Sequence, residues 1–368
     1  SPAKGGASMS VFDDPSFFPI GVWLQSPGNA AGYRAMGVNT FVAQWNALND
    51  QSMAQLTAAG MNVITDQGRD FAYAGEPRLI AWMHQDEPDN AQADGKGGWG
   101  PPVSPAKLLA DYQAMKAKDP SRPVFLGLGQ GVAWPEYYGR GVDAGRTDVY
   151  YRYAEAGDIL RFDIYPVNSP DAPVHGKLWL VAQGVDNLRK YGHDAKPVWA
   201  VIETTNIDGR EAAHTPTPHQ VKAEVWMALV HGAKGISYFC HIFKPRFDEP
   251  GLLHDDVMRP AVSAINRQIT ELAPVLNSAT ITGDAAVASS NAAVPIDVME
   301  KRYGGATYLF AVGMRDGATT GRFTVPSLAA SGAANVEVIG EGRSLRLVNG
   351  AFGDAFEPYG VHLYKIGG

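Results

Sequence analysis

The sequence predicts an α/β protein in which a (β/α)8 TIM barrel is followed by an antiparallel β-sandwich. The first observation is that eight short apolar runs, each followed by a plausible helix, recur along the chain. The second is a change after residue 275 to glycine-rich turns and strands of two-residue alternation. Because 368 residues exceed one ordinary domain and such a barrel needs about 250, we divide the chain into a lead-in (1–17), a barrel (18–275) and a sandwich (276–368).

The predicted barrel strands are short apolar runs, as expected of strands that are buried on both faces. They span Phe18–Leu24, Thr40–Trp45, Met61–Asp66, Leu79–Gln85, Pro123–Gly129, Ile159–Tyr165, Pro197–Glu203 and Gly235–His241. Helices are predicted over Ala30–Met36, Asp50–Ala59, Ser104–Lys118, Trp179–Tyr191, Thr217–His231 and Pro260–Leu272. The pairs Ser104-Pro105 and Thr217-Pro218 indicate helix starts, because an N-cap hydroxyl precedes a proline at the first helical position.

The C-terminal part is predicted to be an antiparallel sandwich packed on the barrel. Its strands are expected over Thr307–Val312, Gly321–Pro326, Asn335–Ile339, Ser344–Val348 and Val361–Ile366. Small-residue turns separate these strands, and they carry no evident catalytic cluster. We therefore look for the chemistry in the barrel.

Composition excludes several classes of function. The net charge of −7 gives no basic surface for nucleic acid or an anionic membrane, so neither is expected as a partner. No apolar run reaches the length of a membrane span. The single cysteine, Cys240, excludes an internal disulfide and a multi-cysteine metal site. Because the chain begins at Ser1 without Met, we expect a leader removed from a secreted or periplasmic precursor.

Two glutamates stand at the ends of predicted strands, where α/β barrels build active sites. Glu87 follows the apolar run that begins at Leu79, and Pro88 after it cannot continue a sheet ladder. Glu203 ends the run Val201-Ile202-Glu203. By the predicted strand count, these are the ends of the fourth and seventh strands.

With glutamates at these two positions, the chain resembles the clan A glycoside hydrolases, whose barrels carry the acid/base glutamate after strand four and the nucleophile after strand seven. The resemblance covers residues 18–275 and rests on two positions plus topology. It implies a retaining hydrolase that cleaves the O-glycosidic bonds of a poly- or oligosaccharide by double displacement. Glu87 would be the acid/base and Glu203 the nucleophile. Neither a cofactor nor a metal is expected.

Asp86 departs from the clan pattern, which usually has asparagine directly before the acid/base. An Asp-Glu pair after strand four also resembles the substrate-assisted N-acetylhexosaminidases, in which the aspartate orients the substrate's acetamido group. On that interpretation Asp86 and Glu87 carry the reaction and Glu203 does not. A third possibility is a catalytically inactive carbohydrate-binding barrel, since a fold does not fix a function.

Further substrate contacts are predicted from the other strand ends and from an aromatic loop. These residues are Trp23, Gln44, Trp45, Asp66 and Gln67 after the first three strands, Trp134 in the loop after the fifth, and Tyr165 and His241. The clan resemblance implies that Tyr165 donates a hydrogen bond to Glu203 and lowers its pKa. Aromatic rings at such positions suit a carbohydrate substrate, because they stack on sugar faces.

Overall fold

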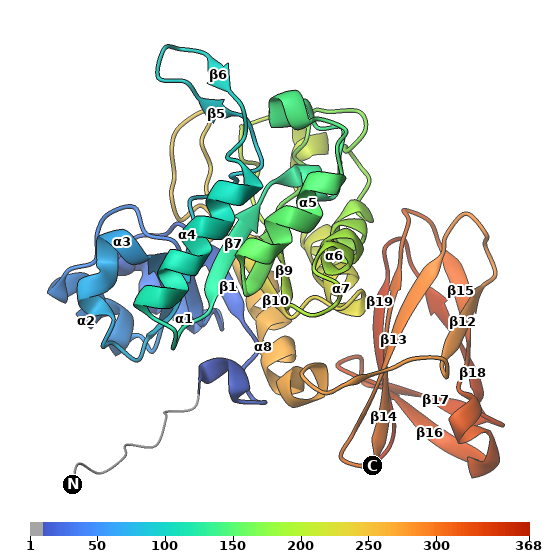
Figure 1. Ribbon diagram of the computed structural model, residues 1–368. Helices are drawn as coiled ribbons and strands as arrows, with labels where there is room; N and C mark the ends of the chain where they lie inside the picture. Colours follow the sequence, from blue (N-terminus) through green and yellow to red (C-terminus); the bar gives the residue numbers. More distant parts are fainter. Residues whose placement is uncertain (1–9) are drawn as a thin grey trace, which may run out of the picture.

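The structure is a computed structural model that describes residues 10–368, and it contains a closed barrel of eight parallel strands (Figure 1). The strands are β1 (Ile20–Trp23), β2 (Thr40–Val42), β3 (Asn62–Asp66), β4 (Leu79–Met83), β7 (Val124–Leu128), β8 (Ile159–Phe162), β9 (Val198–Glu203) and β10 (Gly235–Phe239). Each lies within the run predicted for it, so the predicted barrel is confirmed. The short strands β5 (Gln92–Ala93) and β6 (Trp99–Gly100) form a separate hairpin after β4.

Helices surround the barrel and connect its strands. They are α1 (Ala30–Ala35), α2 (Asp50–Ala58), α3 (Gln67–Asp70), α4 (Pro105–Lys118), α5 (Asp148–Tyr153), α6 (Leu180–Tyr191), α7 (Pro218–Val230) and α8 (Met258–Leu276). Both predicted N-caps are confirmed. The Ser104 hydroxyl accepts from the Lys107 amide at 3.2 Å, and Thr217 forms a reciprocal capping box with Gln220.

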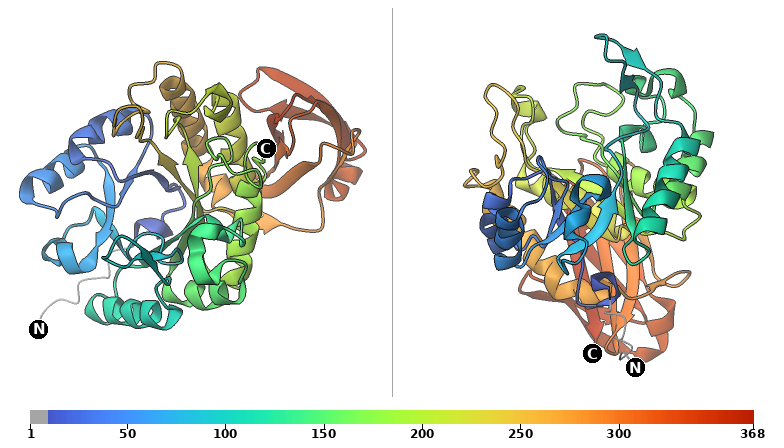
Figure 2. Two further views of the ribbon diagram at one scale, coloured as in Figure 1. Left: turned by 90° about the horizontal axis from the view of Figure 1, so that it is seen from above. Right: turned by 60° about the vertical axis from the view of Figure 1, so that its left-hand side comes forward.

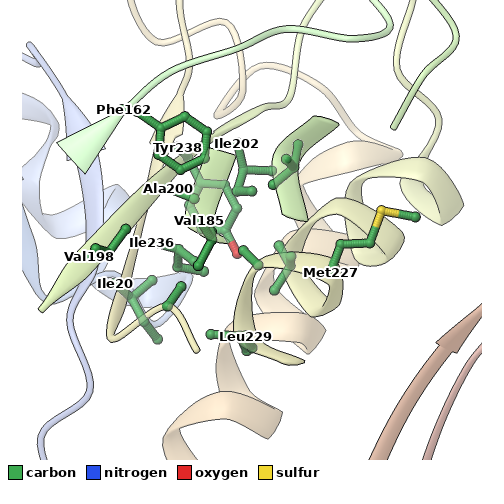
Figure 3. Packing of buried hydrophobic residues seen from close by; sticks show 14 of the residues in the cluster. Ile20, Phe162, Val185, Val198, Ala200, Ile202, Met227, Leu229, Ile236 and Tyr238 are labelled. Carbon is green, nitrogen blue, oxygen red and sulfur yellow. The ribbon is translucent and has the colours of Figure 1, made fainter. Parts of the chain in front are cut away.

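Helix α7 is buried on nearly all sides because it packs between the barrel and the sandwich. Figure 3 shows the barrel side of this packing, which includes Val185, Met227, Leu229, Val198, Ala200 and Ile202. On the other side, Trp226 stacks on Phe310 of the sandwich with 5.5 Å between ring centroids. A helix that is apolar on all sides has to be buried on all of them, here by the barrel and by the sandwich. One face of the sandwich therefore shares a hydrophobic core with the barrel helices, while the inside of the sandwich has a core of its own.

The C-terminal part is an antiparallel sheet of nine strands that forms a β-sandwich beside the barrel (Figure 2). The strands are β11 (Thr280–Ile281), β12 (Ala286–Ser289), β13 (Ile296–Tyr303), β14 (Ala306–Gly313), β15 (Thr319–Thr324), β16 (Ala333–Val338), β17 (Arg343–Val348), β18 (Ala351–Phe356) and β19 (Val361–Gly367). The five predicted strands are confirmed as β14 to β17 and β19. The other four were missed; β13, for example, contains the run Glu300-Lys301-Arg302, which interrupts an apolar pattern.

The predicted boundary between the two parts, at residues 275 and 276, falls in the last turn of α8. Of the predicted lead-in, residues 1–9 lie outside the described residues, whereas Phe12 and Phe17 pack against the residues that fill the barrel. Within residues 10–368, no helix combines the length and the apolar character that a membrane crossing requires.

Candidate active site at the carboxyl end of the barrel

Three carboxyl groups gather at the C-terminal end of the barrel. Asp86 and Glu87 follow β4, and Asp163 follows β8 directly. Beyond the end of β4 the chain stays paired with β7, because the Glu87 amide donates to the Gly127 carbonyl at 2.9 Å. Glu87 itself has a φ of 47°, a left-handed conformation that costs a non-glycine residue on the order of 1 kcal/mol or more. Such strain is typical of functional sites, where the surrounding structure enforces it.

Asp86 is held by a buried arginine inside the barrel. Its Oδ1 lies 3.0 Å from Nη1 of Arg161, a side chain that is almost fully buried, and the Arg161 guanidinium lies over the Trp23 ring. Gly127 makes room for this pair, since a Cβ there would stand 2.9 Å from Nη1. Burial raises the pKa of Asp86 to about 6 although Arg161 opposes the shift. The carboxyl lines a cavity, and 35% of its side-chain surface is exposed.

Glu87 and Asp163 are neighbouring carboxyls at the mouth of the barrel. The negative charge of Asp163, followed by burial and the charge of Asp86, raises the pKa of Glu87 well above its usual range. Oδ1 of Asp163 is buried and has no hydrogen-bond partner among the described residues. A proton on the neighbouring Glu87 would give this oxygen a donor. Asn90 donates to Oε2 of Glu87 at 2.7 Å, which fixes the position of the Glu87 carboxyl.

The prediction that Tyr165 donates to Glu203 is wrong. The Tyr165 hydroxyl donates to Oδ2 of Asp163 at 2.7 Å instead. The physical reason is that both residues extend from β8 toward the same group of carboxyls, while the Glu203 carboxylate is occupied by the backbone that follows Tyr165. Tyr165 thus orients Asp163, whose negative charge raises the pKa of Glu87.

Glu203 is fully buried at the end of β9. Its carboxylate accepts from the amides of Val167 and Asn168 at 3.0 and 2.9 Å and from Nδ2 of Asn168 at 2.8 Å. Glu224 of α7, also fully buried, lies beside it, and burial, followed by the charge of Glu203, raises the pKa of Glu224 well above its usual range. Glu203 therefore fastens the loop after β8 and has no surface open to a substrate.

A cavity of about 700 Å³ lies against Asp86 and Glu87, a volume in the usual range for ligand sites. Its other walls come from the β5–β6 hairpin, which projects above the barrel in Figure 1, and from the loop after β7. These walls include Asn90, Gln92, Trp99, Tyr137 and Tyr138. The predicted contact Trp134 lies behind them and packs on Tyr137 with 5.4 Å between ring centroids. The cavity thus joins two acidic groups to an aromatic wall.

Three other predicted contacts lie elsewhere on the barrel mouth. Gln44 and Trp45 line a second, smaller hollow of about 210 Å³. His241 is almost fully buried, and its Nε2 lies 2.9 Å from the Leu24 carbonyl. It therefore supports the loop after β1 rather than facing the cavity.

Asp66 and Gln67 have local structural partners instead of a place in either hollow. Asp66 caps α3 by accepting from the Arg69 amide at 2.7 Å. Gln67 is buried and donates to the Met115 carbonyl of α4 at 2.9 Å. Neither residue lines the cavity that holds Glu87, so their role in substrate binding stays a prediction.

The sequence interpretation missed Arg161, Trp99 and the role of Asp163. Arg161 stands in the middle of an apolar run, Ile159-Leu160-Arg161-Phe162, and a charge there needs a buried partner. That signal could have identified Asp163 and Asp86 as its counter-ions. Trp99 lies in a glycine-rich stretch, and nothing local indicates that this stretch folds over the barrel mouth.

Comparison with known proteins supports the fold. No protein-family model matches the chain, and no curated protein matches it either. Among solved structures, α-galactosidase I from Mortierella vinacea is similar with a TM-score of 0.55 at 10% identity, over 97% of this chain and 98% of that one. A putative α-galactosidase from Bacteroides fragilis has a TM-score of 0.57 at 11% identity, over 96% and 80%.

A third structure, described as a glycoside hydrolase, is similar with a TM-score of 0.58 at 12% identity, over 95% of this chain and 92% of that one. These similarities cover both the barrel and the sandwich. Because the sequence identity is so low, these similarities support the fold alone. The chain thus has the overall fold of these solved glycoside hydrolases, an eight-stranded parallel barrel with a C-terminal β-sandwich.

Proposed function

We propose that the protein is a glycoside hydrolase in which Glu87 is the general acid. The observation that carries this proposal is that Asp86 and Glu87 face one cavity while Asp163 favours a proton on Glu87. Glycosidic cleavage needs a proton for the leaving oxygen and a negative group near the anomeric carbon. Glu87 supplies the proton and Asp86, positioned by Arg161, supplies the negative charge. The fold shared with solved α-galactosidases supports a carbohydrate substrate.

We infer that Asp86, rather than Glu203, faces the anomeric carbon. The double displacement predicted from the sequence needs a nucleophile that can reach the sugar, and the Glu203 carboxylate is buried under the loop after β8. In our proposal, Asp86 attacks as the glycosidic bond breaks, and the leaving oxygen takes the Glu87 proton. Water then releases the sugar from Asp86 and returns a proton to Glu87, so that the configuration is retained.

A substrate-assisted N-acetylhexosaminidase is the second candidate. It is favoured by the same exposure of the Asp86–Glu87 pair to the cavity. Here Asp86 would orient the acetamido group, whose oxygen would bond to the anomeric carbon while Glu87 protonates the leaving oxygen. Water would then displace the acetamido oxygen with the help of Glu87.

A panel of 4-nitrophenyl glycosides with 2-hydroxyl or 2-acetamido groups tests the proposal. We expect hydrolysis of at least one 2-hydroxyl glycoside, with the retained anomer as the first product by proton NMR. Hydrolysis of 2-acetamido glycosides alone would favour the second candidate. The proposal fails if no glycoside or oligosaccharide is cleaved while sugars still raise the Tm, which is the behaviour of an inactive binding barrel.

The pH dependence of kcat/KM should reflect the ionisation of both Asp86 and Glu87. Activity should fall below about pH 6 as Asp86 becomes protonated, and at higher pH as Glu87 loses its proton. Asp163→Asn removes the charge that contributes most to the raised pKa of Glu87, so the alkaline limb should move to lower pH. An alkaline limb that stays in place in Asp163→Asn would show that Asp163 does not control the acid.

A further inference from the structure

A second group of aromatic side chains lies at the barrel mouth, outside the cavity of Asp86 and Glu87. Trp45 follows β2, and Phe243 and Phe247 lie in the loop after β10; their surfaces are 45%, 43% and 52% exposed. The Phe243 and Phe247 rings are nearly parallel, with centroids 5.8 Å apart, and Trp45 meets Phe247 edge-on at 6.3 Å. We call these three residues the aromatic platform.

The aromatic platform is held in place by the loops that carry it. Ile242 and Asp248 exchange two backbone hydrogen bonds of 2.9 and 2.8 Å, which close the turn that presents both phenylalanines. Glu249 then accepts from the Ser26 amide at 3.0 Å and from its hydroxyl at 2.7 Å. The loop after β10 is thereby tied to the loop after β1. Rings that are already ordered lose little conformational entropy when a ligand binds.

The hollow beside Trp45 is lined by uncharged polar side chains. They include Ser26, Gln44, Asn46, Asn49, Gln51 and Gln55. Within residues 10–368, no hydrogen bond to protein engages the side-chain amides of Asn46, Gln51 or Gln55, so both their donors and acceptors are free. Amides that can donate and accept suit hydroxyl groups, whereas the lining offers no charged group for an ionic ligand.

Aromatic contacts connect the platform to the carboxyl cluster. Phe243 stacks on His241 at 5.8 Å, His241 meets Phe239 at 5.0 Å, and Phe239 meets Tyr165 at 5.4 Å. Tyr165 is the residue that donates to Asp163. The loop after β10 and the β5–β6 hairpin both rise from the same end of the barrel (Figure 2). Both sites therefore open at the same end of the barrel.

We propose that the aromatic platform and the amide-lined hollow form a second carbohydrate subsite, which binds a neutral polysaccharide that runs across the barrel mouth. Exposed rings stack on the apolar faces of sugar residues, and the free amides bind their hydroxyl groups. The direction of the chain toward Glu87 rests on the proposed function. Binding at the platform itself does not require hydrolysis.

Affinity electrophoresis tests this subsite. Native gels would contain galactomannan, mixed-linkage β-glucan or xylan as neutral polymers, or polygalacturonate as an acidic one. The parent is Glu87→Gln, so that the polymer is not cut during the run. We expect at least one neutral polymer to retard the parent, and Trp45→Ala or the double change Phe243→Ala/Phe247→Ala to weaken that affinity about tenfold. Trp45→Phe, which keeps a ring, should restore most of the retardation.

The matched control is Tyr303→Ala, which removes an exposed aromatic residue from β13 of the sandwich and should leave retardation unchanged. The subsite is disproved if no neutral polymer retards the parent, if only polygalacturonate does, or if Trp45→Ala migrates like the parent. Retardation that depends on Trp45, in a wild type that cleaves no glycoside, would support the subsite and disprove the hydrolase. Hydrolysis of aryl glycosides without such retardation would do the reverse.

Discussion

Replacing Glu87 by glutamine is expected to lower kcat for glycosides with poor leaving groups by about 10²- to 10⁴-fold. The amide keeps the size of the side chain and can still accept from Asn90, which donates to Oε2 in the parent, but it has no acidic proton. Turnover should recover for 2,4-dinitrophenyl glycosides, because that leaving group needs no protonation. The measurement is kcat for phenyl and dinitrophenyl glycosides of the same sugar, with the Tm as a check on folding.

Glu136→Gln is the matched control for this experiment, since Glu136 is an exposed carboxyl on the loop after β7 and does not line the cavity. It should leave kcat for both substrates unchanged. A Glu87→Gln enzyme that loses both activities equally would show that the residue does not act as the acid.

Replacing Glu203 by alanine is expected to lower the free energy of unfolding by about 3 kcal/mol or more. The change leaves the amides of Val167 and Asn168 without their acceptor in a buried place and leaves Glu224 beside a void. Urea denaturation followed by tryptophan fluorescence measures the loss. A stability equal to that of the wild type would show that the buried carboxylate does not hold the loop after β8.

Glu224→Gln is the matched variant, because its amide can still donate to Glu203 while it removes a buried ionisable group. The folded-state pKa of Glu224 is raised, so the wild type loses stability as pH rises above the unfolded pKa, near 4.5. The variant avoids that loss. It should match the wild type near pH 4.5 and be more stable at pH 8, by about 1 kcal/mol or more; a lower stability at pH 8 would contradict the protonated state of Glu224.

The barrel could be predicted from sequence because each of its strands is a local apolar run and the same strand–helix unit is repeated. Each strand is buried on both faces, so each of the eight is visible as an apolar run that ends near a polar residue. Only some of the strands of the sandwich could be predicted from the sequence. Strands such as β13 and β18 (Ala351–Phe356) mix charged or small residues with apolar ones, and their pairing partners lie far away in the sequence.

The site was harder to predict because it depends on which groups the loops cover. Glu87 could be found from the proline that follows its strand. Nothing near Glu203 in the sequence indicates that Val167 and Asn168 fold over it and that Glu224 approaches from a helix. Arg161 was visible as a charge inside a strand, but its partners, Asp86 and Asp163, follow two different strands. Only the closed barrel brings these groups together.

The most direct test of the account compares kcat/KM per folded molecule for Glu87→Gln and Glu203→Gln, with one phenyl glycoside as substrate. Both changes replace a carboxyl by an amide of the same size, but only Glu87 faces the cavity. We expect Glu87→Gln to be the far less active variant and folded Glu203→Gln to keep measurable turnover. An inactive, fully folded Glu203→Gln beside an active Glu87→Gln would contradict the assignment of Glu87 as the acid.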